Sequence, residues 1–393
     1  MNALIELGLQ VPVRLDSTLC SRFRSTKSEC AACAVVCPAP GAVRLGDGAG
    51  NNGAEINAAC VACGACVSAC PNGAIRLLED DQRVAERIAQ KVHSGETFRF
   101  ACNRAKGRAE MVLPCLSRLT EALVLEPIRR GAQQVELREP DCSGCGLRKT
   151  AQQWERTLVF SQALCESAGL GAARISSVQV QVGNAEEIRL PARGPSSRRR
   201  LFGSIAERWK ASGDAPLETE AGEEAEPEPF REIVKRHSEN SKRTDLLRVL
   251  DALPGLKVTP KEVVTVGLPL AQLEVDSRCV GCNVCETLCP TGALTHREEG
   301  GNYALDFDAA HCTGCRVCEL ACYHQALHLR ETVDLSLLFQ RSRVTLISAR
   351  LANCQACGER ILGTASTFCP TCQVKASGDR RDSVARLFFS GGN

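Results

Sequence analysis

The spacing of the cysteines constrains the fold of this chain more than any other feature. The chain has 393 residues and 25 cysteines. Three stretches repeat one pattern, in which two, two and then three residues separate four successive cysteines. Repetition of this kind indicates several copies of one structural unit. The copies are CVACGACVSACP from Cys60, CVGCNVCETLCP from Cys279 and CTGCRVCELACY from Cys312.

Short alternating segments typical of strands flank each cysteine run. AEINAA precedes Cys60, LEVDSR precedes Cys279 and YALDFDAAH precedes Cys312, while AIRLL and ALHLR follow two of the runs. We therefore expect each unit to be a strand, a cysteine loop, a short helix and a second strand. Two such units pair into a small α+β module.

Thiolates at these intervals are the ligands of iron–sulfur clusters. Three cysteines spaced three residues apart surround three corners of one 4Fe-4S cubane, and the fourth reaches a neighbouring cluster. Pro71 and Pro290 follow two of the runs, and Tyr323 takes that place in the third. A disulfide framework is disfavoured, because the chain is long and its first residues lack the features of a secretion signal.

The first cysteine group departs from this spacing. Cys30, Cys33 and Cys37 keep the intervals, but the next cysteine upstream is Cys20. The inserted residues, SRFRSTKSE, are polar and basic, so we expect them to form a surface loop. We expect Cys20 to supply the missing ligand across this loop; the alternatives are a three-iron cluster or a ligand other than cysteine.

These runs resemble the bacterial-type two-cluster ferredoxins and the polyferredoxins built from them, over residues 11–78 and 270–331. The resemblance implies four 4Fe-4S clusters that transfer single electrons at low potential. It also implies the ligand sets, which we call sites 1 to 4: Cys20, Cys30, Cys33 and Cys70 (site 1); Cys60, Cys63, Cys66 and Cys37 (site 2); Cys279, Cys282, Cys285 and Cys322 (site 3); Cys312, Cys315, Cys318 and Cys289 (site 4).

The segment between the two modules has a different pattern. TFRFACN and AEMVLPCL read as strands, LTEALVLEPIRRGA as a helix, QQVELREP as a strand, AQQWERTLVFSQALCESAGLG as a helix and RISSVQVQV as a strand. This order predicts an α/β domain with a mainly parallel sheet. Cys165 falls on an apolar stripe of its helix, which indicates a core residue.

Around residues 97–150 this middle domain resembles the delta subunit of methyl-viologen-reducing hydrogenases, through LPCLSRL, the helix after it and the later DC-x-x-C. The resemblance implies a 2Fe-2S cluster at what we call the middle site, where Arg104 and Ala105 stand in place of a second family C-x-x-C pair. Reduced thiols or a zinc site are the alternatives. The strand ends of an open parallel sheet converge on one crevice. The cysteines of the middle site are Cys102, Cys115, Cys142 and Cys145.

The C-terminal segment CQACGERILGTASTFCPTC contains two C-x2-C pairs. Paired knuckles of this kind present four thiolates tetrahedrally and suit zinc, with a redox iron site as the alternative. We call this group the knuckle. Its cysteines are Cys354, Cys357, Cys369 and Cys372.

The expected organisation is multidomain, α+β and α/β. It comprises a two-cluster ferredoxin module (1–80), a hydrogenase-delta-like α/β domain (95–190), a charged linker (191–245), a second two-cluster module (246–335) and a zinc-ribbon-like domain (340–393).

Composition excludes several function classes. The net charge of +2 gives no global reason to expect a nucleic-acid partner. No stretch approaches the roughly 20 apolar residues of a membrane span, and we expect a cytoplasmic location.

No catalytic residues are identified, because the chain has no nucleotide-binding glycine motif and no nucleophile elbow. We favour a non-catalytic electron-transfer subunit of a larger oxidoreductase, with a flavoprotein or a hydrogenase as its redox partner. The alternative is an enzyme, or a metal-regulated binding protein, that uses the middle crevice as its site.

Overall fold

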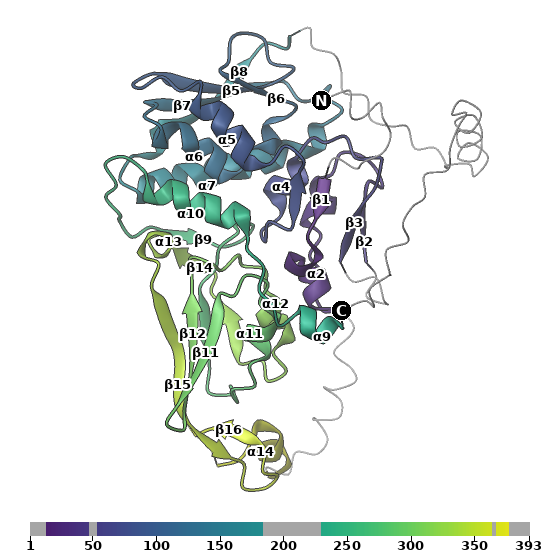
Figure 1. The fold of residues 1–393 in the computed structure, drawn as a ribbon, viewed down its shortest axis with the longest axis vertical. Helices are drawn as coiled ribbons and strands as arrows, with labels where there is room; N and C mark the ends of the chain where they lie inside the picture. Colours follow the sequence, from purple (N-terminus) through teal and green to yellow (C-terminus); the bar gives the residue numbers. More distant parts are fainter. Residues whose placement is uncertain (1–12, 47–52, 184–228, 364–366, 377–393) are drawn as a thin grey trace, which may run out of the picture.

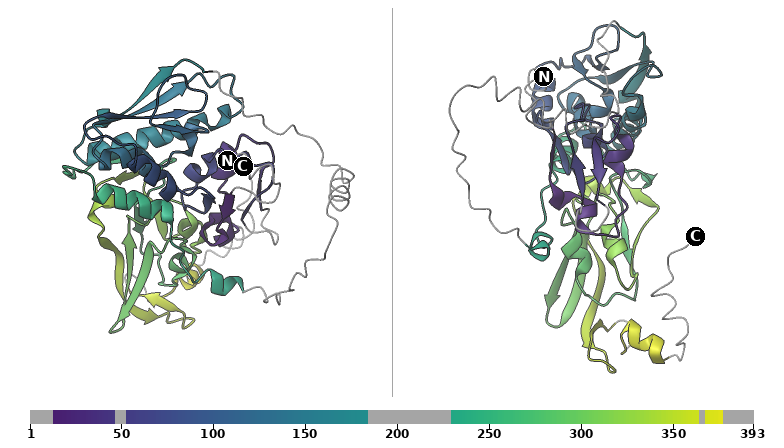
Figure 2. Two further views of the ribbon diagram at one scale, coloured as in Figure 1. Left: turned by 45° about the horizontal axis from the view of Figure 1, so that its top comes forward. Right: turned by 90° about the vertical axis from the view of Figure 1, so that its right-hand side faces the viewer.

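The computed structural model describes residues 13–46, 53–183, 229–363 and 367–376, and most of the expected linker lies outside these ranges. The described parts form an elongated molecule, with the middle domain at one end and the knuckle at the other (Figure 1). The second module lies between them, and the first module lies beside the junction of the middle domain and the second module (Figures 1 and 2).

The first module consists of two antiparallel strand pairs and short helices. β1 pairs with β4, and β2 pairs with β3. The helix after each cysteine loop has only five residues. The elements are β1 (Val13–Leu15), η1 (Ser17–Leu19), α2 (Ser21–Arg24), α3 (Ala32–Val36), β2 (Val43–Leu45), β3 (Ala54–Ile56), α4 (Ala65–Ala69) and β4 (Ile75–Leu77).

The second module repeats this plan with one longer strand pair and one additional pair. β10 pairs with β13, β11 with β12 and β9 with β14, all antiparallel. The unit of strand, cysteine loop, short helix and strand that the sequence predicts is therefore present in both modules. The elements are β9 (Glu262–Val264), β10 (Leu273–Val275), α11 (Val284–Leu288), β11 (Leu294–Glu299), β12 (Asn302–Asp308), α12 (Val317–Ala321), β13 (Leu327–Leu329), β14 (Thr332–Asp334) and α13 (Leu337–Gln340).

The middle domain contains a four-stranded parallel sheet in the order β6-β5-β7-β8, so the predicted α/β architecture is confirmed. Its helices α6 and α7 lie on the face of the sheet that is turned toward the rest of the molecule (Figures 1 and 2). The elements are α5 (Asp81–Ala89), β5 (Thr97–Cys102), β6 (Met111–Leu113), η2 (Leu116–Arg118), α6 (Glu121–Arg129), β7 (Gln134–Pro140), η3 (Arg148–Thr150), α7 (Ala151–Ser167), η4 (Ala172–Arg174) and β8 (Ile175–Val180).

One hydrophobic core joins the middle domain to the second module. It includes Leu123 and Leu125 of α6, Leu250 of α10 (Ser241–Asp251), and Leu335 and Leu338 of the second module. Helix α10 therefore crosses the boundary that we expected at residues 245/246, and it belongs to the folded body. A short helix, α9 (Phe230–Ile233), precedes it.

The C-terminal segment extends the sheet of the second module. β15 (Arg343–Asn353) pairs antiparallel with β12, from Asn302 opposite Arg350 to Asp308 opposite Arg343. The resulting sheet has the order β11-β12-β15-β16, and α14 (Pro370–Ala376) follows β16 (Arg360–Leu362). The knuckle is thus attached to the second module through a continuous sheet.

The inserted segment after Cys20 is not the surface loop that the sequence predicts. Its first residues form α2, and Ser21, Arg24 and Ser28 are 2%, 1% and 4% exposed. The guanidinium of Arg24 donates to the carbonyl oxygens of Thr18, Val234 and Arg236. A polar segment can be buried when backbone carbonyls of other segments supply its hydrogen bonds, and the local sequence does not reveal those partners.

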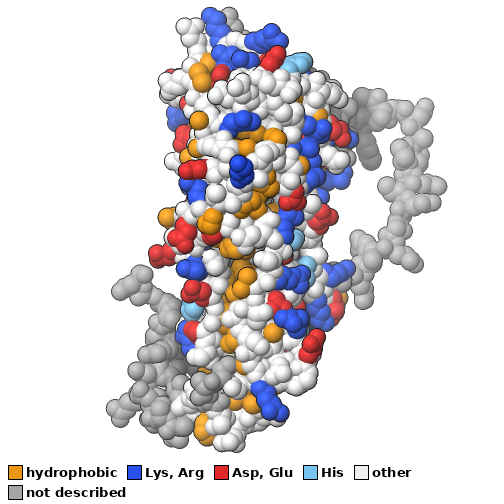
Figure 3. Space-filling model, turned by 90° about the vertical axis from the view of Figure 1, so that its left-hand side faces the viewer, with side chains coloured by type: hydrophobic (Ala, Val, Ile, Leu, Met, Phe, Trp, Pro, Cys, Tyr) orange, Lys and Arg blue, Asp and Glu red, His pale blue; other side chains and the backbone are white. Residues whose placement is uncertain are grey.

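Charged side chains of both signs are interspersed on the face shown in Figure 3, with hydrophobic side chains along its middle. This distribution agrees with the nearly neutral net charge of the chain. Among the described residues, no helix combines the length and the apolar character that crossing a lipid bilayer requires.

Candidate metal centres

The cysteine loops share an unusual backbone conformation. Three loops contain two left-handed residues at equivalent positions: Ala62 and Gly64, then Gly281 and Asn283, then Gly314 and Arg316. Their φ angles lie between 53° and 79°. Successive N–H groups in such turns point toward one side and form a concavity that binds anions. The backbone is therefore shaped to surround a negatively charged group.

Sites 3 and 4 each surround a cavity. All four cysteines of site 3 line one cavity, and all four of site 4 line another. Backbone N–H groups point at two of the sulfurs, from Ala326 to Cys322 Sγ at 3.3 Å and from Ala293 to Cys289 Sγ at 3.3 Å. Each of these two cysteines is the last of its own run and belongs to the site formed by the first three cysteines of the other run.

The cysteines of site 1 are also brought together, although Cys20 lies far upstream of the regular run. Burial and, after it, the nearby thiols of Cys70, Cys30 and Cys20 together raise the pKa of Cys33 to about 12. Cys20 therefore lies near the other cysteines of site 1.

Site 2 has the same character. Burial raises the pKa of Cys66 well above its ordinary value, with further contributions from Cys63, Cys60, Cys33 and Cys37. Since Cys33 belongs to site 1, sites 1 and 2 are neighbours within the first module. The pKa of Cys318 of site 4 is raised by burial, by the other thiols of site 4 and also by Cys285 of site 3, so sites 3 and 4 are neighbours too.

The cysteines of the middle site converge at the carboxyl ends of three parallel strands. Cys102 ends β5, Cys115 follows β6, and Cys142 and Cys145 follow β7. All four line one cavity, together with Arg104 and Trp154. Burial and, after it, the other three thiols of the middle site together raise the pKa of Cys142 to about 11.

Arg104 is a functional candidate that the sequence analysis named only as a departure from a family pattern. Its side chain hydrogen-bonds Cys145, and Cys145, Cys102 and Cys142 raise its pKa. A guanidinium therefore faces the thiols at the middle site, in the place where the resemblance implied a further cysteine.

The four thiols of the knuckle lie within 4.8 Å of one another. Backbone N–H groups of Cys369 and Cys372 point at the sulfurs of Cys354 and Cys369, at 3.2 Å and 3.4 Å. The N–H of Cys369 is the main cause that lowers the pKa of Cys354 to about 6. Four soft donors at this separation suit a tetrahedral metal ion.

The donor sets fit iron–sulfur clusters. Grouping buried thiols so that they raise one another's pKa is unfavourable unless a cationic group replaces their protons. The cysteine loops add inward N–H groups, which stabilise the negative charge of a thiolate-bound cluster. Cys165 is different: it is fully buried in the hydrophobic core of the middle domain, and burial raises its pKa to about 12. Its prediction as a core residue is confirmed.

Several charged or polar residues near these centres could not be found from the cysteine pattern. Tyr303 lies beside site 3, hydrogen-bonds Asn283 Oδ1 at 3.0 Å, and is stacked under Arg360. Lys242 and Arg243 of α10 lie beside Cys70 and Cys312. They belong to a segment assigned to the linker, and no periodicity or motif associates them with a metal centre.

Comparison with known families agrees with the two modules. Residues 28–75 and residues 278–326 each match a family described as a 4Fe-4S dicluster domain. The first match begins after Cys20. No curated protein matches the chain.

The chain therefore contains two ferredoxin-like 4Fe-4S dicluster domains, as the cysteine runs predict. Domains of this class serve iron–sulfur electron transfer. The matched stretches do not include the middle domain or the knuckle.

Proposed function

We propose that this protein relays low-potential electrons through four 4Fe-4S clusters, as a subunit of a larger cytoplasmic oxidoreductase complex. The observation that carries the proposal is the gathering of sixteen cysteines into four groups of four. The abundance of reduced, grouped thiols favours a reducing compartment. The redox partner is a flavoprotein or a hydrogenase-type subunit, because the sequence has no nucleotide-binding motif of its own.

In this proposal each site takes three cysteines from one run and one from the partner run. When bound, a 4Fe-4S cluster accepts and releases one electron at low potential. The residues of the chain fix the thiolates, exclude water and set the local charge. Arg278 illustrates charge control near site 3: it faces Cys322 but is paired with Asp276, whose pKa it holds at about 2.

The middle site is proposed to hold a 2Fe-2S cluster. The support is the convergence of four thiols on one cavity, together with the resemblance to the hydrogenase delta subunit over residues 97–150. Arg104 would offset part of the negative charge of four thiolates and raise the reduction potential of the site.

The knuckle is proposed to hold zinc with a structural role. Its sheet strand β16 places Leu362 against Gly281 in the cysteine loop of site 3, and Arg360 over Tyr303. A metal ion that orders the knuckle would therefore also hold a cover over site 3.

Anaerobic metal analysis tests these assignments. We expect about sixteen to eighteen irons, a matching amount of sulfide and one zinc per chain, with EPR signals of reduced 4Fe-4S clusters. An iron content of about eight would eliminate one dicluster module from the proposal. Sixteen irons without a 2Fe-2S signal would eliminate only the cluster of the middle site.

Purification from the native source tests the place of the protein in a complex. We expect it to co-purify with a flavoprotein or a hydrogenase-type subunit. An isolated chain that converts a small molecule with an artificial electron donor would contradict the proposal of a non-catalytic subunit.

A further inference from the structure

The two dicluster modules meet directly at a buried polar contact. Asn72 is 1% exposed and donates from Nδ2 to the carbonyl oxygen of Leu19 at 2.8 Å and to Ser21 Oγ at 2.9 Å. Its Oδ1 accepts a hydrogen bond from Thr313 Oγ1 at 2.5 Å. Ser21 also hydrogen-bonds the thiol of Cys315. Residues adjacent to the site 1 ligands thus contact the cysteine loop of site 4.

A buried guanidinium occupies the same contact. Arg24 belongs to the first module, is 1% exposed, and has Cys289 and Cys315 of site 4 among its charged neighbours. Burial lowers its pKa and those thiols oppose the shift. The first module therefore supplies a positive charge to a site of the second module.

Helix α10 adds two more cations between the modules. Lys242 Nζ donates to the carbonyl oxygens of Ser68 and Cys70, on the site 1 side. The next residue, Arg243, is 4% exposed and donates from Nη2 to the carbonyl oxygen of Cys312 at 3.1 Å, on the site 4 side. Consecutive residues of one helix thus face two sites that belong to different modules.

The middle site has its own neighbour in the first module. Burial is the main cause that raises the pKa of Cys63. Among the charged groups around it, Cys115 of the middle site contributes most, ahead of Cys37 and Cys60 of site 2. Ser68 Oγ of α4 donates to the carbonyl oxygen of Leu119 at 2.8 Å. The middle domain therefore meets the first module on the site 2 side.

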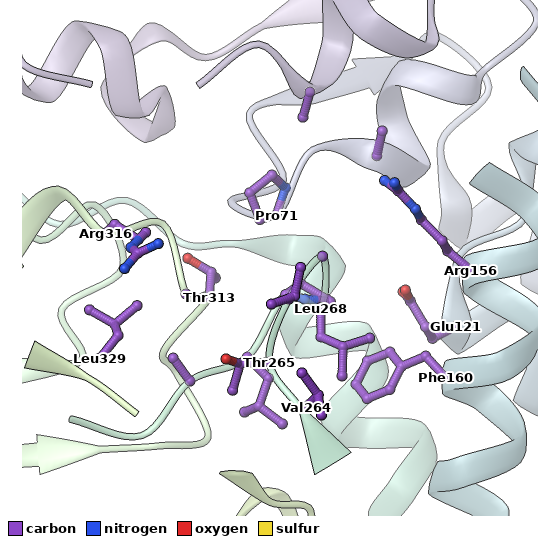
Figure 4. Close-up of a pocket in the computed structure, with 18 of the residues that line it drawn as sticks. Pro71, Glu121, Arg156, Phe160, Val264, Thr265, Leu268, Thr313, Arg316 and Leu329 are labelled. Atoms are coloured by element: carbon purple, nitrogen blue, oxygen red, sulfur yellow. The ribbon is translucent and has the colours of Figure 1, made fainter. Parts of the chain in front are cut away.

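A groove of about 780 Å³ separates the loop of site 4 from helix α7 of the middle domain. Arg156 and Phe160 line it on one side, Thr313 and Arg316 line it on the other, and Leu268 lies between them (Figure 4). The second module approaches the middle domain through its hydrophobic core and α10, whereas site 4 faces the first module.

From these contacts we infer that the five centres form one line in the order middle site, site 2, site 1, site 4, site 3. The domain order along the sequence places the middle domain between the modules, but the contacts place the middle site next to site 2 and site 1 next to site 4. This inference rests on the proposed function. One electron moves at a time, lost by a donor protein at one end and gained by an acceptor protein at the other, and no bond in the chain changes.

The order also assigns a role to the buried cations. Arg24, Lys242 and Arg243 surround the junction of sites 1 and 4, and positive charge near a cluster favours its reduced state. Site 3 has Arg278 nearby, but this side chain is paired with Asp276. We therefore expect sites 1 and 4 to be more easily reduced than site 3.

Magnetic coupling between reduced clusters tests the order. The double variant Cys60→Ala, Cys279→Ala removes one ligand each from sites 2 and 3 and leaves sites 1 and 4. The matched variant Cys30→Ala, Cys312→Ala leaves sites 2 and 3. After reduction with dithionite, we expect a broadened, fast-relaxing EPR spectrum from the first variant. We expect the second to show no coupling between sites 2 and 3, because site 2 there has only the middle site as a neighbour.

Uncoupled signals of sites 1 and 4 in the first variant, or coupling between sites 2 and 3 in the second, would overturn the order. Iron and sulfide counts on both variants establish that two 4Fe-4S clusters remain in addition to the middle site. Failure of the proposed function is distinguished by the unchanged chain, whose iron content would then fall well short of the roughly sixteen irons of four 4Fe-4S clusters.

Potentiometric EPR on variants that keep all the cluster cysteines provides a second test. Lys242→Gln is expected to shift the midpoint potential of site 1 to a more negative value. Lys235→Gln is the control, because Lys235 is solvent-exposed and paired with Glu232. An unchanged site 1 potential in Lys242→Gln would contradict the role assigned to α10.

Discussion

Gly64 lies between two ligands of site 2 and adopts φ of +79°. A Cβ at this position would lie 2.2 Å from Cδ of Arg118. Arg118 cannot easily move aside, because its Nη1 pairs with Asp81 at 2.7 Å and its Nη2 donates to the carbonyl oxygen of Glu79. The glycine therefore allows the cysteine loop of site 2 to lie close to η2, which follows Cys115.

The substitution Gly64→Ala should lower stability by about 2–3 kcal/mol, through left-handed strain and the clash together. Gly95→Ala is the matched control, since Gly95 has the same φ of +79° but no atom within 4 Å of the added Cβ. We expect it to cost only about 1 kcal/mol. Denaturant unfolding under anaerobic conditions measures both variants. Equal losses would show that contact with Arg118 contributes nothing.

Arg24 shows what the sequence could not reveal at the level of residues. Its neighbours in the chain are polar and basic, and they predict a surface loop. The structure buries it because Val234 and Arg236, more than 200 residues away, supply carbonyl acceptors. When the hydrogen-bond acceptors of a buried charge lie far away in the sequence, the local sequence carries no sign of them. The cysteines are different, because ligand spacing is a local property and the pattern located the dicluster domains.

At the scale of elements, the knuckle contains thiols whose pKa values are shifted in opposite directions. Backbone N–H groups lower the pKa of Cys354 to about 6, whereas the hydrogen bonds that the Cys372 thiol donates to Cys357 and Cys369 raise the pKa of Cys372 to about 12. Cys372 thus loses a proton to the metal across the neutral range. Cys354 has a proton to lose only below about pH 6.

We therefore expect the zinc affinity of the knuckle to fall as the pH falls, with a slope that steepens by one proton below about pH 6. Competition with a chelator across this range measures the slope. In Cys354→Ser the steepening should disappear, whereas in the core variant Cys165→Ser it should persist. A constant slope through pH 6 in the unchanged chain would contradict the role assigned to the backbone N–H groups.

Element boundaries could be predicted wherever the pattern was local and periodic. The four parallel strands of the middle domain and the helices between them were predicted from alternation and helical spacing. Helix α10 was divided between a linker and a module, because its sequence is highly charged and its apolar side is short. Only the partners of Leu246 and Leu250, on distant elements, show that this helix belongs to the core.

At the scale of the whole molecule, the middle domain and the second module depend on each other for stability, because they share one hydrophobic core. Leu250 is fully buried in the core cluster that includes residues of α6 and of the second module. A change at this position should therefore affect the middle domain and the second module together, because neither part has a separate apolar core on that side.

Leu250→Ala is expected to destabilise the protein by about 2–5 kcal/mol, since it leaves a cavity at the point where the parts meet. Heating at a fixed rate, with circular dichroism reporting the fold and visible absorbance reporting the clusters, should show one transition that shifts by the same amount in both signals. Val266→Ala, at a position that is 85% exposed, should change the midpoint little. Two separate transitions, with only one displaced by Leu250→Ala, would mean that the middle domain and the second module fold independently. The line of centres would then be held together only by the contacts that the first module makes with the middle domain and with the second module.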